Sequence, residues 1–326
     1  MINLKKIKKL LKVNRIDGYI IPKNDKFFGE YISESEDRLK FISKFSGSYG
    51  FALILRKKNY LFVDGRYTLQ AKIQCGKEFK INTMPKKFPS DVLGNKIIRI
   101  GFDPKLHTEI TFSHLFKKNN CKLIPLEENL IDKIWKRKNI NKFKQIYKLK
   151  DKISGKNSQK KIKELSKILK KNNINIQFVT ASENVAWLLN IRGEDSEFSP
   201  IPNSYLILND KNKVYFFCNL KKINKKLRKE IKDIEILDIK YIKQFLLSIK
   251  NRAVQVDKTS CSIFHKNIIK KNNIIFEKHD PIYFLKAIKN KIEIKNIIKS
   301  HIYDGAALTK FLFWVKNNFK NKKISE

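Results

Sequence analysis

The sequence contains few of the residues that build redox and metal sites. It has four cysteines in 326 residues, widely separated and without a CxxC pair: Cys75, Cys121, Cys218 and Cys261. We expect reduced, mostly buried thiols, as in cytoplasmic proteins. The five histidines form no HxxxH or HExxH pair: His107, His114, His265, His279 and His301. His107 and His114 are predicted to share a helix over 107–118, but no carboxylates cluster with them. We therefore expect no metal and no cofactor in this chain.

Long hydrophobic runs are also missing. No segment approaches the roughly 20 apolar residues that cross a bilayer. The N-terminus alternates apolar residues with lysines at helical spacing, and no cleavage site follows it. These features predict a cytoplasmic protein that begins with an amphipathic helix over residues 3–15 and does not bind membranes.

Acidic residues are scarce: 31 against 71 basic ones, which gives a formal net charge of +40. The basic excess is spread along the chain and does not gather in one arm or stripe. There is no zinc-finger spacing and no aromatic RNA-binding signature. We expect no specific nucleic-acid binding, only salt-sensitive attraction to polyanions.

The common catalytic motifs are missing as well. The sequence has no GxSxG elbow, no P-loop and no GxGxxG. The cysteines have no histidine partner that would activate them as nucleophiles. We therefore predict no catalytic residue in this chain.

The sequence does contain an internal repeat. An amphipathic helix, a short strand, a second helix, a glycine turn and a β-hairpin occur in the first half. The same order returns from residue 160 onward. The repeat predicts an α/β protein with two similar domains, each a mixed sheet flanked by helices. We place the domains at 1–145 and 146–280, because residues 137–157 are lysine-rich and largely aperiodic.

The tail, 281–326, departs from the repeat. Its apolar residues fall near helical spacing and predict one long amphipathic helix, broken near Gly305. The face carrying Phe311, Phe313 and Trp314 requires a partner surface.

Residues 180–195 are the least generic passage. Thr180 or Ser182 is predicted to cap a short helix, and Gly193 is predicted to end it. Trp187 lies among Val, Ala and Leu residues and is expected in the core.

Two loop clusters are candidates for contact with a ligand or partner. Asp64-Gly65-Arg66-Tyr67 follows a predicted strand, and Arg66 has the planar fork that binds a carboxylate. A salt bridge from Asp64 to Arg66 that fixes the turn is the alternative. The second cluster is residues 190–195 in the second half of the chain. There too the alternative is structural: an ion pair between Arg192 and Asp195. The candidate rim or interface residues are Arg38, Asp64, Arg66, Tyr67, Asn190, Arg192 and Asp195.

Several of these passages resemble one enzyme family. Residues 38–48 and 61–71 resemble the N-terminal domain of Xaa-Pro aminopeptidases of the creatinase-like group, and 183–195 resembles their second domain. Residues 281–290 and 301–307 resemble the linker and opening helix of their third, catalytic domain. The resemblance implies two domains of one fold, followed by a domain that cleaves before proline with two metals, usually manganese.

None of the family's five metal ligands has a matching position here, because the chain ends within what resembles the first catalytic helix. The resemblance therefore implies a non-catalytic portion, inactive alone, that serves dimerisation and active-site gating. Its partners would be a second copy or a separate catalytic chain, with a peptide substrate only in the completed enzyme. The alternatives are a stand-alone binding or scaffold module and a decayed gene product.

Overall fold

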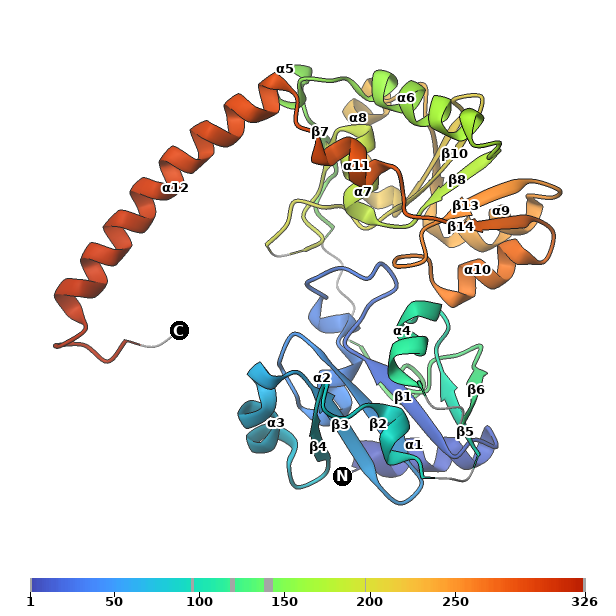
Figure 1. Ribbon diagram of the computed structural model, residues 1–326, viewed down its shortest axis with the longest axis vertical. Helices are drawn as coiled ribbons and strands as arrows, with labels where there is room; N and C mark the ends of the chain where they lie inside the picture. The colour runs from blue at the N-terminus through green and yellow to red at the C-terminus, as the bar shows by residue number, and fades with distance from the viewer. Residues whose placement is uncertain (1, 95–96, 118–120, 138–142, 197, 325–326) are drawn as a thin grey trace.

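The computed structural model describes residues 2–94, 97–117, 121–137, 143–196 and 198–324. Two α/β domains lie one above the other, and a long helix extends from the second (Figure 1). The elements of the first domain are α1 (Ile2–Val13), β1 (Gly18–Pro22), η1 (Glu34–Glu36), α2 (Arg38–Ser43), β2 (Gly50–Leu55), β3 (Asn59–Val63), η2 (Gly65–Tyr67), α3 (Thr68–Cys75), β4 (Lys80–Thr83), η3 (Pro89–Val92), β5 (Ile98–Phe102), α4 (Glu109–Leu115) and β6 (Cys121–Pro125).

The second domain repeats this order. Its elements are β7 (Tyr147–Lys148), α5 (Asp151–Ser154), α6 (Ser158–Lys171), β8 (Ile176–Val179), α7 (Ser182–Leu189), β9 (Ile191–Arg192), β10 (Tyr205–Asn209), β11 (Val214–Cys218), η4 (Leu220–Lys222), α8 (Lys225–Glu230), β12 (Glu235–Asp238), η5 (Ile239–Tyr241), α9 (Ile242–Ser248), β13 (Ala253–Val256), α10 (Ile263–Lys270) and β14 (Ile274–Glu277). The chain then continues into α11 (Ile282–Ala287) and α12 (Lys291–Asn318).

The two sheets have one topology, which confirms the predicted fold class. Their strand orders are β4-β3-β2-β1-β5-β6 and β12-β11-β10-β8-β13-β14. In each sheet one strand, β2 or β10, runs antiparallel to both neighbours. The hydrogen bonds repeat as well: Asp17 N–H donates to Arg99 O, and Asn175 N–H donates to Ala253 O. The predicted internal repeat therefore extends to single backbone contacts.

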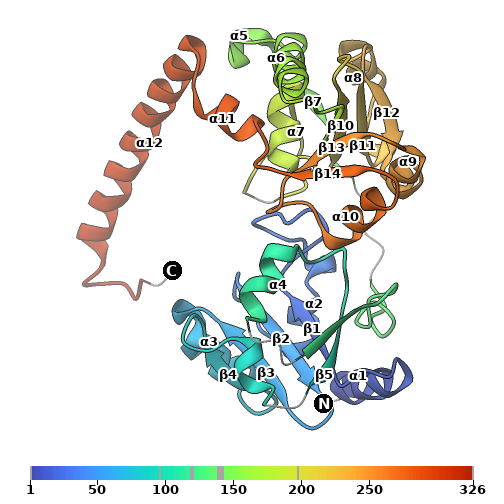
Figure 2. The ribbon, with the colours of Figure 1, turned by 45° about the vertical axis from the view of Figure 1, so that its right-hand side comes forward.

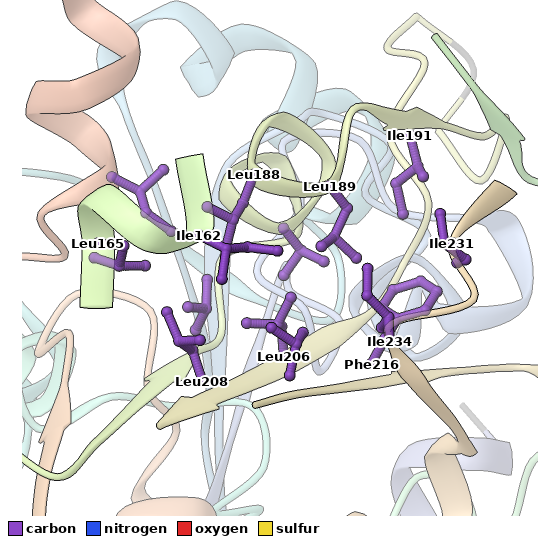
Figure 3. Close-up of a cluster of buried hydrophobic side chains, with 14 of the residues drawn as sticks. Ile162, Leu165, Leu188, Leu189, Ile191, Leu206, Leu208, Phe216, Ile231 and Ile234 are labelled. Carbon is purple, nitrogen blue, oxygen red and sulfur yellow. The ribbon is translucent and has the colours of Figure 1, made fainter. Parts of the chain in front are cut away.

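Each sheet is covered on both faces, so apolar residues dominate its central strands. In the first domain α1, α2 and α3 cover one face, and α4 covers the other. In the second domain α6, α7 and α8 cover one face, and α9 and α10 cover the other. Figure 3 shows Ile162 and Leu165 of α6 and Leu188 and Leu189 of α7 over Leu206 and Leu208 of β10.

The domains are joined by a small, well-ordered interface. Ile263 N–H donates to His107 O at 2.9 Å, and Phe264 N–H donates to Pro104 O at 2.9 Å. Lys266 forms ion pairs with Glu109 of the first domain and Glu277 of its own. The start of α10 is thereby held against the loop that precedes α4.

Some local predictions were wrong. α4 begins at Glu109, so His107 lies before it, fully buried, and does not share a helix with the exposed His114. Burial lowers the pKa of His107 to about 3. Residues 143–157, largely aperiodic in sequence, contain regular structure: Tyr147 and Lys148 pair with Arg192 and Ile191, and α5 follows. Residues 138–142 of the same stretch lie outside the described residues.

The tail also differs from expectation. α12 runs unbroken through Gly305, and the interruption falls before it, where Asn290 caps α12 by accepting from the N–H groups of Ile292 and Glu293. No residue of α12 is buried, and Ile302, Phe311 and Trp314 are 66%, 55% and 43% exposed. Within the described residues no helix is long and apolar enough to cross a membrane.

Candidate functional site

The first candidate cluster lies where β3 ends. Asp64 accepts from the backbone N–H of Arg66 at 2.9 Å and from its guanidinium at 2.6 Å. Arg66 lowers the pKa of the Asp64 carboxyl, and the predicted salt bridge is confirmed. The Arg66 side chain is still 72% exposed and lies over the Tyr67 ring at 5.2 Å. Arg66 therefore fixes its turn and presents part of its guanidinium to solvent.

Arg38, in contrast, faces inward. Its guanidinium donates to Asp132 at 2.8 and 2.9 Å and to the Glu36 carboxylate at 2.8 Å. Burial alone would lower the pKa of Arg38, but the hydrogen bonds and charges of Asp132 and Glu36 raise it. Because these acids occupy the guanidinium, Arg38 is bound within its own domain.

The 180–195 passage starts and ends differently from the prediction. Ala181 holds the N-cap position without a side-chain bond, while Ser182 Oγ exchanges hydrogen bonds with the Ser204 backbone and Thr180 bonds Ser260. Asn190, at φ 54°, ends α7 three residues before Gly193. Asn tolerates this left-handed conformation, so the helix needs no glycine there.

Asn190 is also the centre of a buried polar cluster. Its amide donates to Ser154 Oγ and Lys156 O, and its carbonyl oxygen accepts from Lys161 Nζ at 2.7 Å. Lys161 Nζ also donates to Trp187 O at 2.9 Å and lies 3.9 Å from the Trp187 ring centroid. Burial lowers the pKa of Lys161 to about 8. These bonds give Asn190 a structural role in the corner after α7.

Arg192 and Asp195 do not pair, so the proposed ion pair between them is wrong. Arg192 donates to Ile191 O at 2.8 Å and to Ala186 O at 3.3 Å, and burial lowers its pKa. Asp195 instead forms an ion pair with Lys222 and accepts from the backbone N–H of Asn203 at 2.7 Å. The guanidinium of Arg192 thus closes the helix end, and Asp195 ties down the loop that follows.

The structure brings Asp195 to a groove between the domains. This interdomain groove comprises two adjoining hollows of about 350 and 370 Å³, which share Glu30, Tyr31 and Ser196. Asp195 and Ser48 line the second hollow, and Tyr67 bonds Ser48 at 2.7 Å. Tyr31, which lines both hollows, meets Phe198 edge to face, with ring centroids 5.0 Å apart. Asn190, Arg192, Arg38 and Arg66 do not line the groove.

A second polar network, which the sequence did not reveal, joins α7 to α11. Asn184 Nδ2 donates to Asp280 Oδ2 at 2.8 Å, and Lys286 Nζ donates to Asn184 Oδ1 at 2.6 Å. Tyr283 OH donates to Glu183 at 3.1 Å. Burial is the main cause that raises the pKa of Asp280 to about 6. We call these residues the linker latch, because they fix the segment that leads into α12.

A metal centre does not form in the part of the chain that the structure describes. No three His, Cys, Asp or Glu side chains gather there in a way that would hold an ion. The thiols of Cys75, Cys218 and Cys261 are buried, and burial raises their pKa values, which disfavours the thiolate that binds metals. The described residues therefore do not fit a two-metal site.

Two family models match consecutive parts of the chain. Both are described as the creatinase/prolidase N-terminal domain, and they match residues 3–134 and 137–293. The chain belongs to the creatinase/prolidase N-terminal domain family. It carries two copies of this domain in tandem, in agreement with the repeated topology.

Relatives of this tandem are aminopeptidases. It is 31% identical to a probable Xaa-Pro aminopeptidase P from Laccaria bicolor, over 98% of this chain and 52% of the relative. It is 30% identical to Xaa-Pro aminopeptidase 1 from Dictyostelium discoideum, over 98% of this chain and 54% of the relative. The tandem spans about half the length of these relatives.

One solved structure matches the whole arrangement. It is an X-prolyl aminopeptidase from Caenorhabditis elegans, described as a cytosolic enzyme with a di-nuclear active site. The TM-score is 0.87 at 25% identity, and the match covers 98% of this chain and 56% of the other. The creatinase N-terminal tandem and its following helix are thus a recurring unit of these proteins.

Proposed function

We propose that the chain is the non-catalytic N-terminal portion of a Xaa-Pro aminopeptidase, an enzyme that releases an N-terminal residue preceding proline. Its role is to support dimerisation and to restrict access to the active site. The relatives, which are Xaa-Pro aminopeptidases, support this proposal, as does the share of their length that the chain spans.

The observation that carries the proposal is the exposure of α12. Between Ile302 and Val315 its only charged residues are Asp304 and Lys310, yet every residue of this stretch is exposed or only half-buried. A helix that is apolar all round is normally enclosed by its own domain. We propose that residues 281–326 are the linker and first helix of the catalytic domain, following domains 1–145 and 146–280.

The linker latch supports this assignment because it fixes where α12 points. Asn290 donates to Ser154 O at 2.9 Å, and Asn296 donates to Ile153 O at 3.1 Å. Together with the hydrogen bonds that link Asn184 to Asp280 and to Lys286, these two bonds hold the chain on both sides of the short break before α12. The helix then leaves the second domain, runs down beside it with its ribbon apart from both domains, and ends level with the upper part of the first (Figures 1 and 2). We place the catalytic domain alongside this helix.

We assign the two metals, usually manganese in this family, to the portion that follows α12. Of the candidate rim residues, Arg66, Tyr67 and Asp195 are compatible with a role at the entrance, since Arg66 is exposed and the other two border or contact the groove. Asp64, Arg38, Asn190 and Arg192 are held by hydrogen bonds within their own domains. The cytosolic description of the C. elegans enzyme supports a cytoplasmic location, and a second copy or a separate catalytic chain is the proposed partner.

We expect the purified chain not to hydrolyse Xaa-Pro peptides in the presence of Mn²⁺, because its described residues offer no place for the metals that would activate water. The measurement is release of the N-terminal residue from an Xaa-Pro peptide, with the C. elegans enzyme as the positive control. Turnover that a chelator abolishes and that co-purifies with the chain would contradict the proposal.

A further inference from the structure

Each domain has a pocket at the edge of its sheet where the parallel strands end. In the first domain Asp64 follows β3 and Met84 follows β4, and both line a cavity of about 430 Å³. In the second, Asn219 follows β11 and Ile239 follows β12, and both line a hollow at the corresponding edge. Crevices outside the carboxyl ends of strands are the usual ligand positions in open α/β sheets.

The strand registers show that these two pockets are equivalent. Phe51 pairs with Pro22 and Phe62 in the first sheet, and Tyr205 pairs with Phe217 in the second. Phe51 and Tyr205 therefore occupy equivalent positions in the two sheets. Asp64 and Asn219 also match, since each accepts from the backbone N–H two residues later and caps a 3-10 turn.

In the second domain a loop from the first domain covers Tyr205 and forms one wall of the hollow. The Phe27 ring lies 5.0 Å from the Tyr205 ring, and the Tyr205 hydroxyl donates to Lys26 O at 2.6 Å. Phe27 packs against the apolar cluster that includes Tyr205 and Phe178. A lysine–phenylalanine pair on a neighbouring loop thus covers the aromatic ring at this position of the sheet.

In the first domain the same pocket is open. Phe51 forms its floor, while Tyr49 and Ile110 on its rim are 46% and 41% exposed. The Tyr49 hydroxyl makes no hydrogen bond within the described part of the chain, so it is free to donate as Tyr205 does. Lys117 lies over the ring of Phe88, which closes another side.

We propose that the open pocket of the first domain is a docking site for a loop of a partner polypeptide that presents an aromatic side chain. The aromatic ring fills the space over Phe51 that Phe27 fills over Tyr205 in the other domain. The partner's main-chain carbonyl accepts from Tyr49 at the rim, the counterpart of the bond from Tyr205 to Lys26 O. The lining is mostly apolar, and a cavity of about 430 Å³ has room for an aromatic side chain together with adjoining backbone, which favours such a loop over a highly charged small molecule.

The test uses the loop that covers Tyr205 in the protein itself. The probe is a blocked peptide with the sequence of residues 24–30, Asn-Asp-Lys-Phe-Phe-Gly-Glu, added to the full chain with labelled methyl groups. We expect saturable shifts of the methyl signals of Met84 and Leu115, which line the pocket. A peptide with both phenylalanines replaced by alanine is expected to bind at least about tenfold more weakly, because it buries no aromatic ring.

Two variants distinguish binding in the pocket from nonspecific binding to the protein surface. Ile110→Asp places a carboxylate in the pocket and is expected to abolish the shifts. Ile73→Asp, at a position 86% exposed on α3, should leave them unchanged. The proposal is overturned if no saturable shift occurs, if the alanine peptide binds equally well, or if the shifts fall away from the pocket. Equal loss of binding in both variants would also overturn it.

Discussion

Replacing Arg38 by alanine is expected to lower the free energy of unfolding by about 3 kcal/mol, because it leaves Asp132 and Glu36 without their main partner. The Arg38 side chain is 8% exposed, and Asp132 joins α2 to a segment 94 residues away in sequence. Lysine cannot replace it, since a single ammonium does not supply the two parallel bonds to Asp132. Arg38→Lys should therefore recover only part of the loss.

Arg66→Ala is the matched control. Arg66 also forms a two-point contact with an aspartate, but its side chain is 72% exposed and its partner lies two residues away. Water replaces such a contact at little cost. Urea denaturation of both variants gives the comparison: a clear loss for Arg38→Ala and almost none for Arg66→Ala. Equal losses would show that burial does not separate the two residues.

The second large effect is a pH dependence at Asp280. This carboxyl is 1% exposed, and burial raises its pKa to about 6 from an ordinary 3.8. A carboxyl whose folded pKa is raised stabilises the fold below its unfolded pKa, and this stabilisation is lost as pH rises through the folded pKa. Two pKa units correspond to about 3 kcal/mol. The wild-type chain should lose that amount, relative to Asp280→Asn, between about pH 4 and pH 7.

The difference between the two proteins is the quantity to measure. Asp257, His279, Glu183, Tyr283 and Lys286 also lie near this position and are present in both proteins, so the comparison isolates the contribution of Asp280. Urea unfolding of wild type and Asp280→Asn across this range gives the difference at each pH. A constant difference would show that the pKa of Asp280 in the folded chain is not raised above its value in the unfolded chain.

Much of the fold was predictable from the sequence because the central strands are short, apolar and bounded by turns. The strands β5 (Ile98–Phe102) and β13 (Ala253–Val256), for example, are short and mainly apolar. The outer strands β4 and β14 were missed. Each is only partly buried: Lys80–Thr83 has a single apolar residue, and the apolar residues of Ile274–Glu277 begin with Ile274, which is exposed. At the edge of a sheet, contacts with the neighbouring strand decide the structure, and the local sequence pattern does not.

The candidate site was harder to predict. The salt bridge from Asp64 to Arg66 was foreseen because both residues lie in one turn. The partners of Arg192 and Asp195 were not, because Asp195 binds Lys222, which is 27 residues away. The linker latch joins α7 to residues about 100 positions later. The sequence predicted that α7 ends at Gly193, but the residue with the left-handed backbone conformation is Asn190.

The most direct test of the proposed function is a chimeric enzyme. The portion of the C. elegans X-prolyl aminopeptidase that matches this chain is replaced by residues 1–326, and the remainder is retained. The measurement is Mn²⁺-dependent hydrolysis of an Xaa-Pro peptide by the chimera and by the isolated remainder. We predict chelator-sensitive hydrolysis by the chimera well above that of the remainder alone. A chimera that folds and binds its metals, yet hydrolyses no faster than the isolated remainder, would contradict the account.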